Sequence, residues 1–147
     1  MKVITYSPLE TKKLGELLAK EVLKTKNGNA VVVALEGNLG GGKTTFIQGF
    51  AEGLKLKNKI TSPTFLIFRH YKLQTIRYKH FFHMDAYRIK KLSELEPLGF
   101  KKILSLPRSI VLIEWGERIK KALPKKTRWL EFRHGRKENE RVIKFKI

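Results

Sequence analysis

The chain has 147 residues, enough for one domain (residues 1–147) with a buried core, and its 41% hydrophobic content excludes a disordered protein. It has no cysteine and no apolar run long enough to span a membrane, so disulfides and thiolate chemistry are excluded and a cytoplasmic location is expected. The net charge of +19 favours contact with a polyanion such as RNA, although a lysine-rich composition throughout the organism explains it equally well.

The first part of the chain alternates between helical and strand patterns. Residues 7–10, Ser-Pro-Leu-Glu, have the serine cap, early proline and later glutamate that begin a helix. We expect no secretory signal, because the first six residues lead straight into this helix, which ends at residues 27–28, Asn-Gly. An apolar run at residues 30–35 then predicts a buried strand, and residues 43–54 predict a helix with one apolar face.

The middle of the chain is rich in aromatic residues. Residues 64–73 alternate loosely, and residues 74–84 carry a second aromatic run, so we expect two strands paired as a hairpin. Residues 92–104 have a weak helical periodicity that Pro97 and Gly99 interrupt.

The last part of the chain completes an alternating pattern. Residues 109–115 predict a buried strand, residues 117–123 a short helix, and residues 127–132 and 141–147 a closing hairpin. This alternation indicates an α/β fold whose central sheet is parallel, with the hairpins added as antiparallel strands at its flanks. Ligands of such sheets bind beyond the carboxyl ends of the parallel strands.

The most specific motif is the segment at residues 37–45, which reads Gly-Asn-Leu-Gly-Gly-Gly-Lys-Thr-Thr between the predicted strand and helix. It matches a phosphate-binding loop, in which glycines let backbone N–H groups surround an anion. Lys43 supplies a positive charge for the terminal phosphates, and Thr44 supplies a hydroxyl ligand for Mg²⁺. The other predicted nucleotide-binding residues of this loop are Asn38, Leu39, Gly40, Gly41, Gly42 and Thr45.

A phosphate loop also needs carboxylates that hold Mg²⁺ and place a water or an acceptor. Asp85 is the only aspartate of the chain and lies at the end of an apolar strand, and Glu114 terminates the apolar strand run at residues 110–113. The alternatives are a turn residue for Asp85 and a surface charge for Glu114. Glu36 precedes the loop, but the sequence does not fix the direction of its side chain.

Four other side chains have two interpretations each. His80 and His83 suggest a metal pair, but packed or hydrogen-bonded neutral histidines are the preferred interpretation. Arg88 either neutralises phosphate charge or pairs with an acid, and Trp115 is either a nucleotide-facing wall or, preferably, a core residue. Guanine-specific switch proteins need an Asn-Lys-x-Asp segment, but residues 58–61, Asn-Lys-Ile-Thr, have no aspartate, and protein kinases need two further aspartates, so ATP is favoured over GTP.

Four motifs in chain order resemble the bacterial TsaE family. They are the phosphate loop, Ser-Pro-Thr-Phe at residues 62–65, His-Met-Asp-Ala-Tyr-Arg at residues 83–88 and Ile-Glu-Trp at residues 113–115. The resemblance covers about residues 11–141. That family is the small ATPase of the machinery that builds threonylcarbamoyladenosine (t6A) on tRNA next to the anticodon. The resemblance therefore implies a P-loop nucleotide-binding three-layer fold.

The resemblance also implies a role for each matching residue. Lys43 would contact the β- and γ-phosphates of ATP, and Thr44 would bind Mg²⁺. Thr64, in a switch segment, would sense the γ-phosphate. Asp85 and Glu114 would organise Mg²⁺ and the attacking water, which makes Lys43, Asp85 and Glu114 the expected catalytic residues.

The expected partners also come from the resemblance. The family is cytoplasmic and works with two mutually related proteins of the threonylcarbamoyl-transferase complex, which ATP hydrolysis would reset. The family usually carries an acid at Asn38 and alanine at Gly41, and these departures bear on the hydrolysis rate. A basic RNA-binding protein with a secondary nucleotide site and a small metabolite kinase are the alternative functions, and direct contact with tRNA is open.

Overall fold

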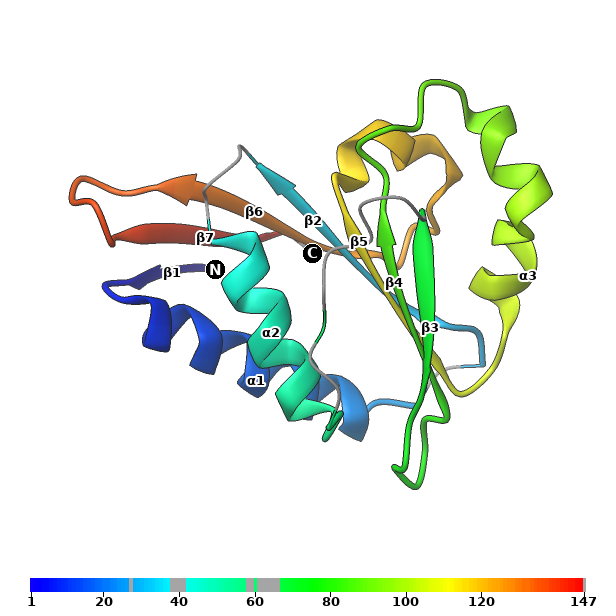
Figure 1. The fold of residues 1–147 in the computed structure, drawn as a ribbon, viewed down its shortest axis with the longest axis horizontal. Helices are drawn as coiled ribbons and strands as arrows, with labels where there is room; N and C mark the ends of the chain where they lie inside the picture. The colour runs from blue at the N-terminus through cyan, green and yellow to red at the C-terminus, as the bar shows by residue number, and fades with distance from the viewer. Residues whose placement is uncertain (27, 38–41, 58–59, 61–66, 147) are drawn as a thin grey trace.

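A computed structural model describes residues 1–26, 28–37, 42–57, 60 and 67–146 of the chain. They form one seven-stranded sheet in the order β1-β7-β6-β2-β5-β4-β3, with helices beside it (Figure 1). The strands are β1 (Lys2–Thr5), β2 (Val31–Gly37), β3 (Phe68–Lys72), β4 (His80–Asp85), β5 (Ser109–Glu114), β6 (Arg128–His134) and β7 (Arg141–Lys146). The helices are α1 (Pro8–Lys24), α2 (Lys43–Gly53) and α3 (Phe100–Ser105), with the 3-10 helices η1 (Leu92–Leu98) and η2 (Gly116–Ala122).

The centre of the sheet is parallel, as predicted. β2 pairs in parallel with both β5 and β6, and β4 pairs in parallel with β5. β3, β7 and β1 join the flanks as antiparallel strands. One part of the prediction is wrong, because the hairpins are not purely antiparallel additions at the flanks. β4 of the first hairpin and β6 of the second hairpin each pair in parallel with a central strand. Both strands carry fully buried apolar side chains, such as Phe81 and Phe132, which suit a sheet that is covered on both faces.

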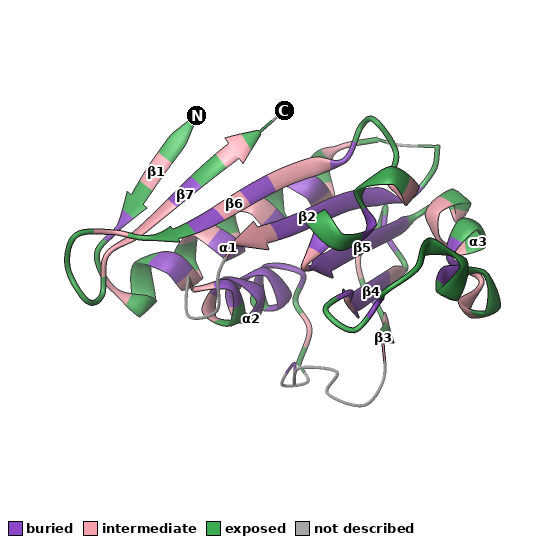
Figure 2. Cartoon of the chain, turned by 90° about the horizontal axis from the view of Figure 1, so that it is seen from above, coloured by how far each residue is buried: buried purple, intermediate pink, exposed green. Residues whose placement is uncertain are grey.

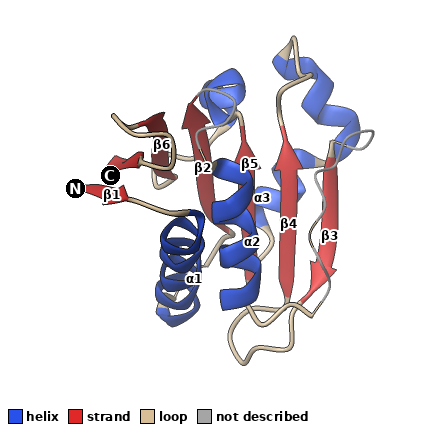
Figure 3. Ribbon diagram, turned by 60° about the vertical axis from the view of Figure 1, so that its left-hand side comes forward, coloured by secondary structure: helices blue, strands red, loops and turns tan. Residues whose placement is uncertain are grey.

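Helices cover both faces of the sheet (Figure 3). Side chains alternate along a strand, so β2 contributes Val31, Val33 and Leu35 to the core beneath α1 and α2. Val32, from the same strand, enters a second core with Phe100 of α3. Figure 2 shows the buried residues concentrated on β2, β5 and α2, which places the central strands between two apolar layers.

Several local predictions are confirmed. The Ser7 hydroxyl accepts the N–H of Glu10 at 3.2 Å and begins α1, while the Glu10 carboxylate accepts the N–H of Tyr6 at 3.1 Å. The break within residues 92–104 falls at Gly99, which has a φ of 68° and separates η1 from α3. In the described part of the chain, no helix is both long and apolar enough to cross a bilayer.

Two segments differ from the prediction. The sequence predicts no strand before residue 7, but β1 pairs with β7 at the opposite end of the chain. Residues 74–79 are predicted as strand, yet they form a turn before β4, closed by the bond from the Leu73 N–H to the Lys79 carbonyl. The aromatic residue in this turn, Tyr78, is buried, and its hydroxyl donates to the Thr25 carbonyl at 2.7 Å.

Candidate nucleotide-binding site

The predicted acids meet where the parallel strands end. Asp85 and Glu114 are paired in register as the last residues of β4 and β5, and Glu114 also pairs with Leu35 of β2. We call this end of the sheet the carboxyl edge. The two acids therefore come together as expected, because parallel neighbouring strands finish at the same level.

Helix α2 begins close to the carboxyl edge, just after the predicted phosphate loop. Its N-cap is Gly42, whose φ of 95° is a conformation that favours glycine. Within the described residues, no side chain caps α2 and no acid occupies its first turn. The N–H groups of that turn point out of the helix with a positive partial charge, which is the chemistry that receives a phosphate.

Gly37 brings the end of β2 close to its neighbour. A Cβ at this position would lie 2.2 Å from the carbonyl oxygen of Phe132, and the φ of 127° is also one that other residues rarely adopt. The Gly37 carbonyl accepts a hydrogen bond from Lys43 Nζ at 2.7 Å, and its N–H donates to Glu117 Oε2 at 3.3 Å. This glycine thus connects the strand to two charged side chains of the site.

Lys43 is almost fully buried, with 5% of its surface exposed. Its ammonium group lies 3.8 Å from the centre of the Trp115 ring. Burial lowers the pKa of Lys43, and the negative charges of Glu117, Glu114 and Asp85 oppose that shift. The ammonium is therefore partly desolvated and held by the Gly37 carbonyl and the Trp115 ring, so a phosphate oxygen would find it oriented and poorly hydrated.

The carboxylate of Glu114 is held by a histidine. Glu114 is buried, and its Oε2 lies 2.8 Å from Nε2 of His83, which is also buried. Because a carboxylate only accepts hydrogen bonds, His83 donates from Nε2. Among the described side chains, His83 Nδ1 is the buried polar atom without a partner. The hydrogen-bonded interpretation of His83 is confirmed, and the bond fixes one rotamer of Glu114.

Asp85 occupies a less polar position than a surface turn residue. Burial raises the pKa of Asp85 and the nearby charge of Glu114 adds to that shift, while the N–H of Tyr87 donates to Oδ1 at 2.9 Å and opposes it. The two carboxylates thus share a partly desolvated space near Lys43. Such a pair favours a bound cation, which would relieve the repulsion between them.

Two residues of the site, Glu117 and Trp115, were not predicted from the sequence as its main members. Glu117 received no role, but it accepts the Gly37 N–H, and desolvation raises its pKa. Its position three residues after Glu114 was the available signal. Trp115 packs partly against the second core, and its ring also contacts the Lys43 ammonium and the Tyr87 ring, so it forms a wall of the site.

The other candidate residues differ in their surroundings. Glu36 of β2 forms an ion pair with Lys146 of β7, which lies beyond β6 in the sheet, and His80 is hydrogen-bonded to His70 at 2.8 Å. Arg88 is exposed. Thr44 is exposed and Thr45 is partly buried at the start of α2, whereas the remaining predicted ligands fall outside the described residues: Asn38, Leu39, Gly40, Gly41 and Thr64.

The donor set fits a magnesium nucleotide rather than a bare metal ion. Within the described ranges, no group of three histidine, aspartate or glutamate side chains could hold a metal. Mg²⁺ commonly takes one or two carboxylates and completes its shell with phosphate oxygens and water. Asp85, Glu114 and the Thr44 hydroxyl are oxygen donors of that kind.

Known proteins resemble this chain over most of its length. The family model described as "Threonylcarbamoyl adenosine biosynthesis protein TsaE" matches residues 5–143. The tRNA threonylcarbamoyladenosine biosynthesis protein TsaE of Bacillus subtilis is 39% identical over 120 residues, covering 82% of this chain and 69% of that protein. The protein of the same name from Treponema pallidum is 33% identical over 127 residues, covering 86% and 87%. The crystal structure of Bacillus subtilis YdiB matches with a TM-score of 0.71 and 33% identity, over 99% of this chain and 83% of that one.

Proposed function

This chain belongs to the TsaE family of threonylcarbamoyl adenosine biosynthesis proteins, and we propose that it serves that pathway as a Mg²⁺-dependent ATPase with a P-loop fold. The observation that carries the proposal is the meeting of three features at the carboxyl edge. These are the uncapped start of α2, the buried ammonium of Lys43, and the carboxylates of Asp85 and Glu114. The helix start and the ammonium suit an anion, and the carboxylates suit a cation, as a magnesium triphosphate requires.

Each described residue has a specific task in this proposal. Lys43 exchanges its bond to the Gly37 carbonyl for a bond to a terminal phosphate oxygen, which is a stronger acceptor because it is charged. The Thr44 hydroxyl and the carboxylates of Asp85 and Glu114 would hold Mg²⁺, and the ion would supply positive charge that neutralises the charge developing on the phosphates. Trp115 limits the access of water to the Lys43 ammonium.

Glu114 is the better placed of the two acids to orient the attacking water. Its carboxylate is buried and restrained by His83, whereas Asp85 receives a backbone N–H and is partly exposed. A restrained acceptor keeps a water in one position at little further entropic cost. We therefore assign Asp85 mainly to the metal and Glu114 to both the metal and the water.

The partners follow from the same family. We propose that the protein acts in the cytoplasm with the two mutually related proteins of the threonylcarbamoyl-transferase complex. Hydrolysis of ATP by this chain would reset that complex between turnovers, and the transfer of the threonylcarbamoyl group would take place on a partner.

Replacement of Lys43 tests the nucleotide site. Lys43→Ala should weaken ATP binding by about 100-fold, because a charge-assisted bond in a desolvated place contributes about 1.5–3 kcal/mol. Lys90→Ala is the matched control, since Lys90 is exposed and follows β4. Titration of a fluorescent ATP analogue with Mg²⁺, alongside thermal unfolding to show that each variant folds, measures the effect. Equal affinity of Lys43→Ala and wild type would refute the site.

A further inference from the structure

The opposite end of the parallel sheet is basic. Four connections lead into β2, β4, β5 and β6, at residues 25–30, 73–79, 106–108 and 123–127. Because these four strands are parallel, their connections meet at one end of the sheet, which we call the amino edge. No aspartate or glutamate occurs in the four connections. Their basic residues are Lys26, Arg77, Lys79, Arg108, Lys125 and Lys126.

The charges of the amino edge are not neutralised by carboxylates. Among the described side chains, none of these six basic residues forms an ion pair. Instead, Arg108 donates to the carbonyl of Ile76 at 2.8 Å and to that of Arg77 at 3.1 Å. Lys79 donates to the carbonyl of Thr75 at 2.7 Å. Neutral carbonyls orient these cations but leave their full positive charge for an external anion.

The amino edge is also held together by bonds between its connections. The Tyr78 hydroxyl donates to the Thr25 carbonyl, and the Arg77 guanidinium donates to the Lys24 carbonyl at the end of α1. Arg108 ties residues 106–108 to the turn that contains Ile76. The guanidinium groups of Arg77 and Arg108 are therefore held in place before any ligand arrives, which lowers the entropic cost of binding.

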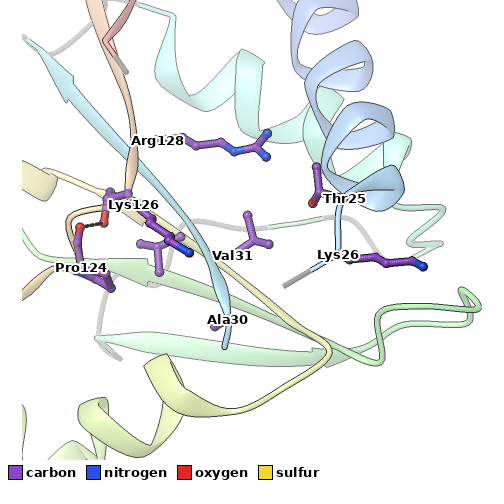
Figure 4. Close-up of a pocket in the computed structure, with 9 residues that line it drawn as sticks. Thr25, Lys26, Ala30, Val31, Pro124, Lys126 and Arg128 are labelled. Carbon is purple, nitrogen blue, oxygen red and sulfur yellow. Dashed lines mark hydrogen bonds between the residues drawn. The ribbon is translucent and has the colours of Figure 1, made fainter. Parts of the chain in front are cut away.

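Two hollows indent this surface. The first has a volume of about 210 Å³, and Figure 4 shows Lys126 and Arg128 on one side of it and Thr25 and Lys26 on the other. The second, of about 270 Å³, shares Thr25 and Lys26 and is also lined by Arg77 and Arg108. None of the described residues that line either hollow is an acid. Each offers several cationic donors to a group the size of a phosphate.

We propose that the amino edge binds the phosphate backbone of RNA, and that the RNA is the tRNA on which this biosynthetic pathway acts. Exposed lysines and arginines suit phosphates, whereas the centres of protein interfaces are depleted of lysine. The proposal goes beyond the nucleotide site, because it concerns the other end of the sheet and uses none of the residues assigned to ATP.

Charge reversal tests the amino edge with the full-length protein and an unmodified tRNA transcript. The test variant is Lys26→Glu/Lys125→Glu/Lys126→Glu, which changes three exposed side chains. The matched control is Lys2→Glu/Lys137→Glu/Lys144→Glu, three exposed lysines outside the amino edge, so both variants lower the net charge of +19 by the same amount. Fluorescence anisotropy at several salt concentrations gives affinities and salt slopes.

We expect the wild-type protein to lose about 10³-fold in tRNA affinity between about 50 and 200 mM salt, as about six phosphate contacts predict. The test variant should bind at least about tenfold more weakly and reduce the salt slope by about three, whereas the control should change both values much less. Lys43→Ala should bind tRNA as wild type does.

Four results would overturn the proposal. They are no tRNA binding by the wild type at low salt, equal weakening by the two triple variants, loss of tRNA binding in Lys43→Ala, and displacement of tRNA by polyglutamate at equal charge concentration. The second would assign the affinity to net charge, the third to the nucleotide site, and the fourth to acidic chains in general. Loss of ATP binding in Lys43→Ala tests the nucleotide proposal separately.

Discussion

The carboxyl edge and the amino edge of the same parallel sheet differ in how they use charge. At the carboxyl edge, one buried ammonium lies near a few partly desolvated carboxylates, and Lys43, Glu114 and Glu117 each have a specific hydrogen-bond partner. At the amino edge, exposed cations are spread over four connections and, within the described part of the chain, have no carboxylate partners. Each desolvated charge has a large effect on the free energy of binding or folding, whereas a solvated charge contributes little by itself, so solvated charges have a large effect only as a group.

The largest expected effect is on turnover at the carboxyl edge. Asp85→Asn and Glu114→Gln should each lower ATP hydrolysis by about 10²-fold while leaving nucleotide affinity within several-fold, because both acids act on metal and water. Glu36→Gln is the control, since that acid also lies near the end of β2 but is paired with Lys146. Phosphate release under saturating ATP measures the effect, and normal rates in both site variants would remove these residues from the reaction.

Replacement of one glycine at each edge should change the free energy of unfolding by different amounts. Gly37→Ala at the carboxyl edge would bring a Cβ to 2.2 Å from the Phe132 carbonyl, and we expect a loss of about 1–3 kcal/mol in the free energy of unfolding. Gly28→Ala at the amino edge meets no atom within 4 Å. It should leave stability unchanged or raise it by up to about 1 kcal/mol. Urea denaturation compares them, and equal losses would contradict the comparison.

When no nucleotide is bound, the ionised carboxylate of Asp85 at the carboxyl edge should lower the free energy of unfolding. Because the pKa of Asp85 is raised on folding, its contribution to stability is present in acid and is lost as the pH rises through the folded value. Asp85→Asn should therefore match wild type below about pH 4 and become more stable towards about pH 7. Each kcal/mol would raise the unfolding midpoint by roughly 2–4 °C. A lower midpoint than wild type at neutral pH would contradict this sign.

The smallest expected effect is at a single cation of the amino edge. Lys126→Ala should weaken tRNA binding by about threefold and reduce the salt slope by about one, without a change in unfolding midpoint. Its exposed side chain makes this substitution a mild one for the fold. If Lys126→Ala alone abolished binding, the amino edge would be a specific pocket rather than a distributed surface.

Local order along the chain made the carboxyl edge partly predictable. A buried strand, a glycine-rich loop and an apolar-faced helix follow one another directly, so the positions of Gly42, Lys43 and Thr44 could be inferred from the sequence. Asp85 and Glu114 were found because each ends an apolar strand. Glu117 was not predicted, since its position in the site depends on a turn at Trp115. The sequence does not indicate the φ of 58° that this turn requires.

The sequence by itself determined the phosphate-loop motif, the acids at the strand ends and the family, because these depend on residues close together in the chain. Only the tertiary structure decided which strands lie in parallel, and hence which side chains meet. The contacts from His83 to Glu114 and from Gly37 to Glu117 join residues 31 and 80 positions apart. The same parallel pairing gathers basic residues from four separate connections at one end of the sheet, because each connection enters a strand that runs in the same direction.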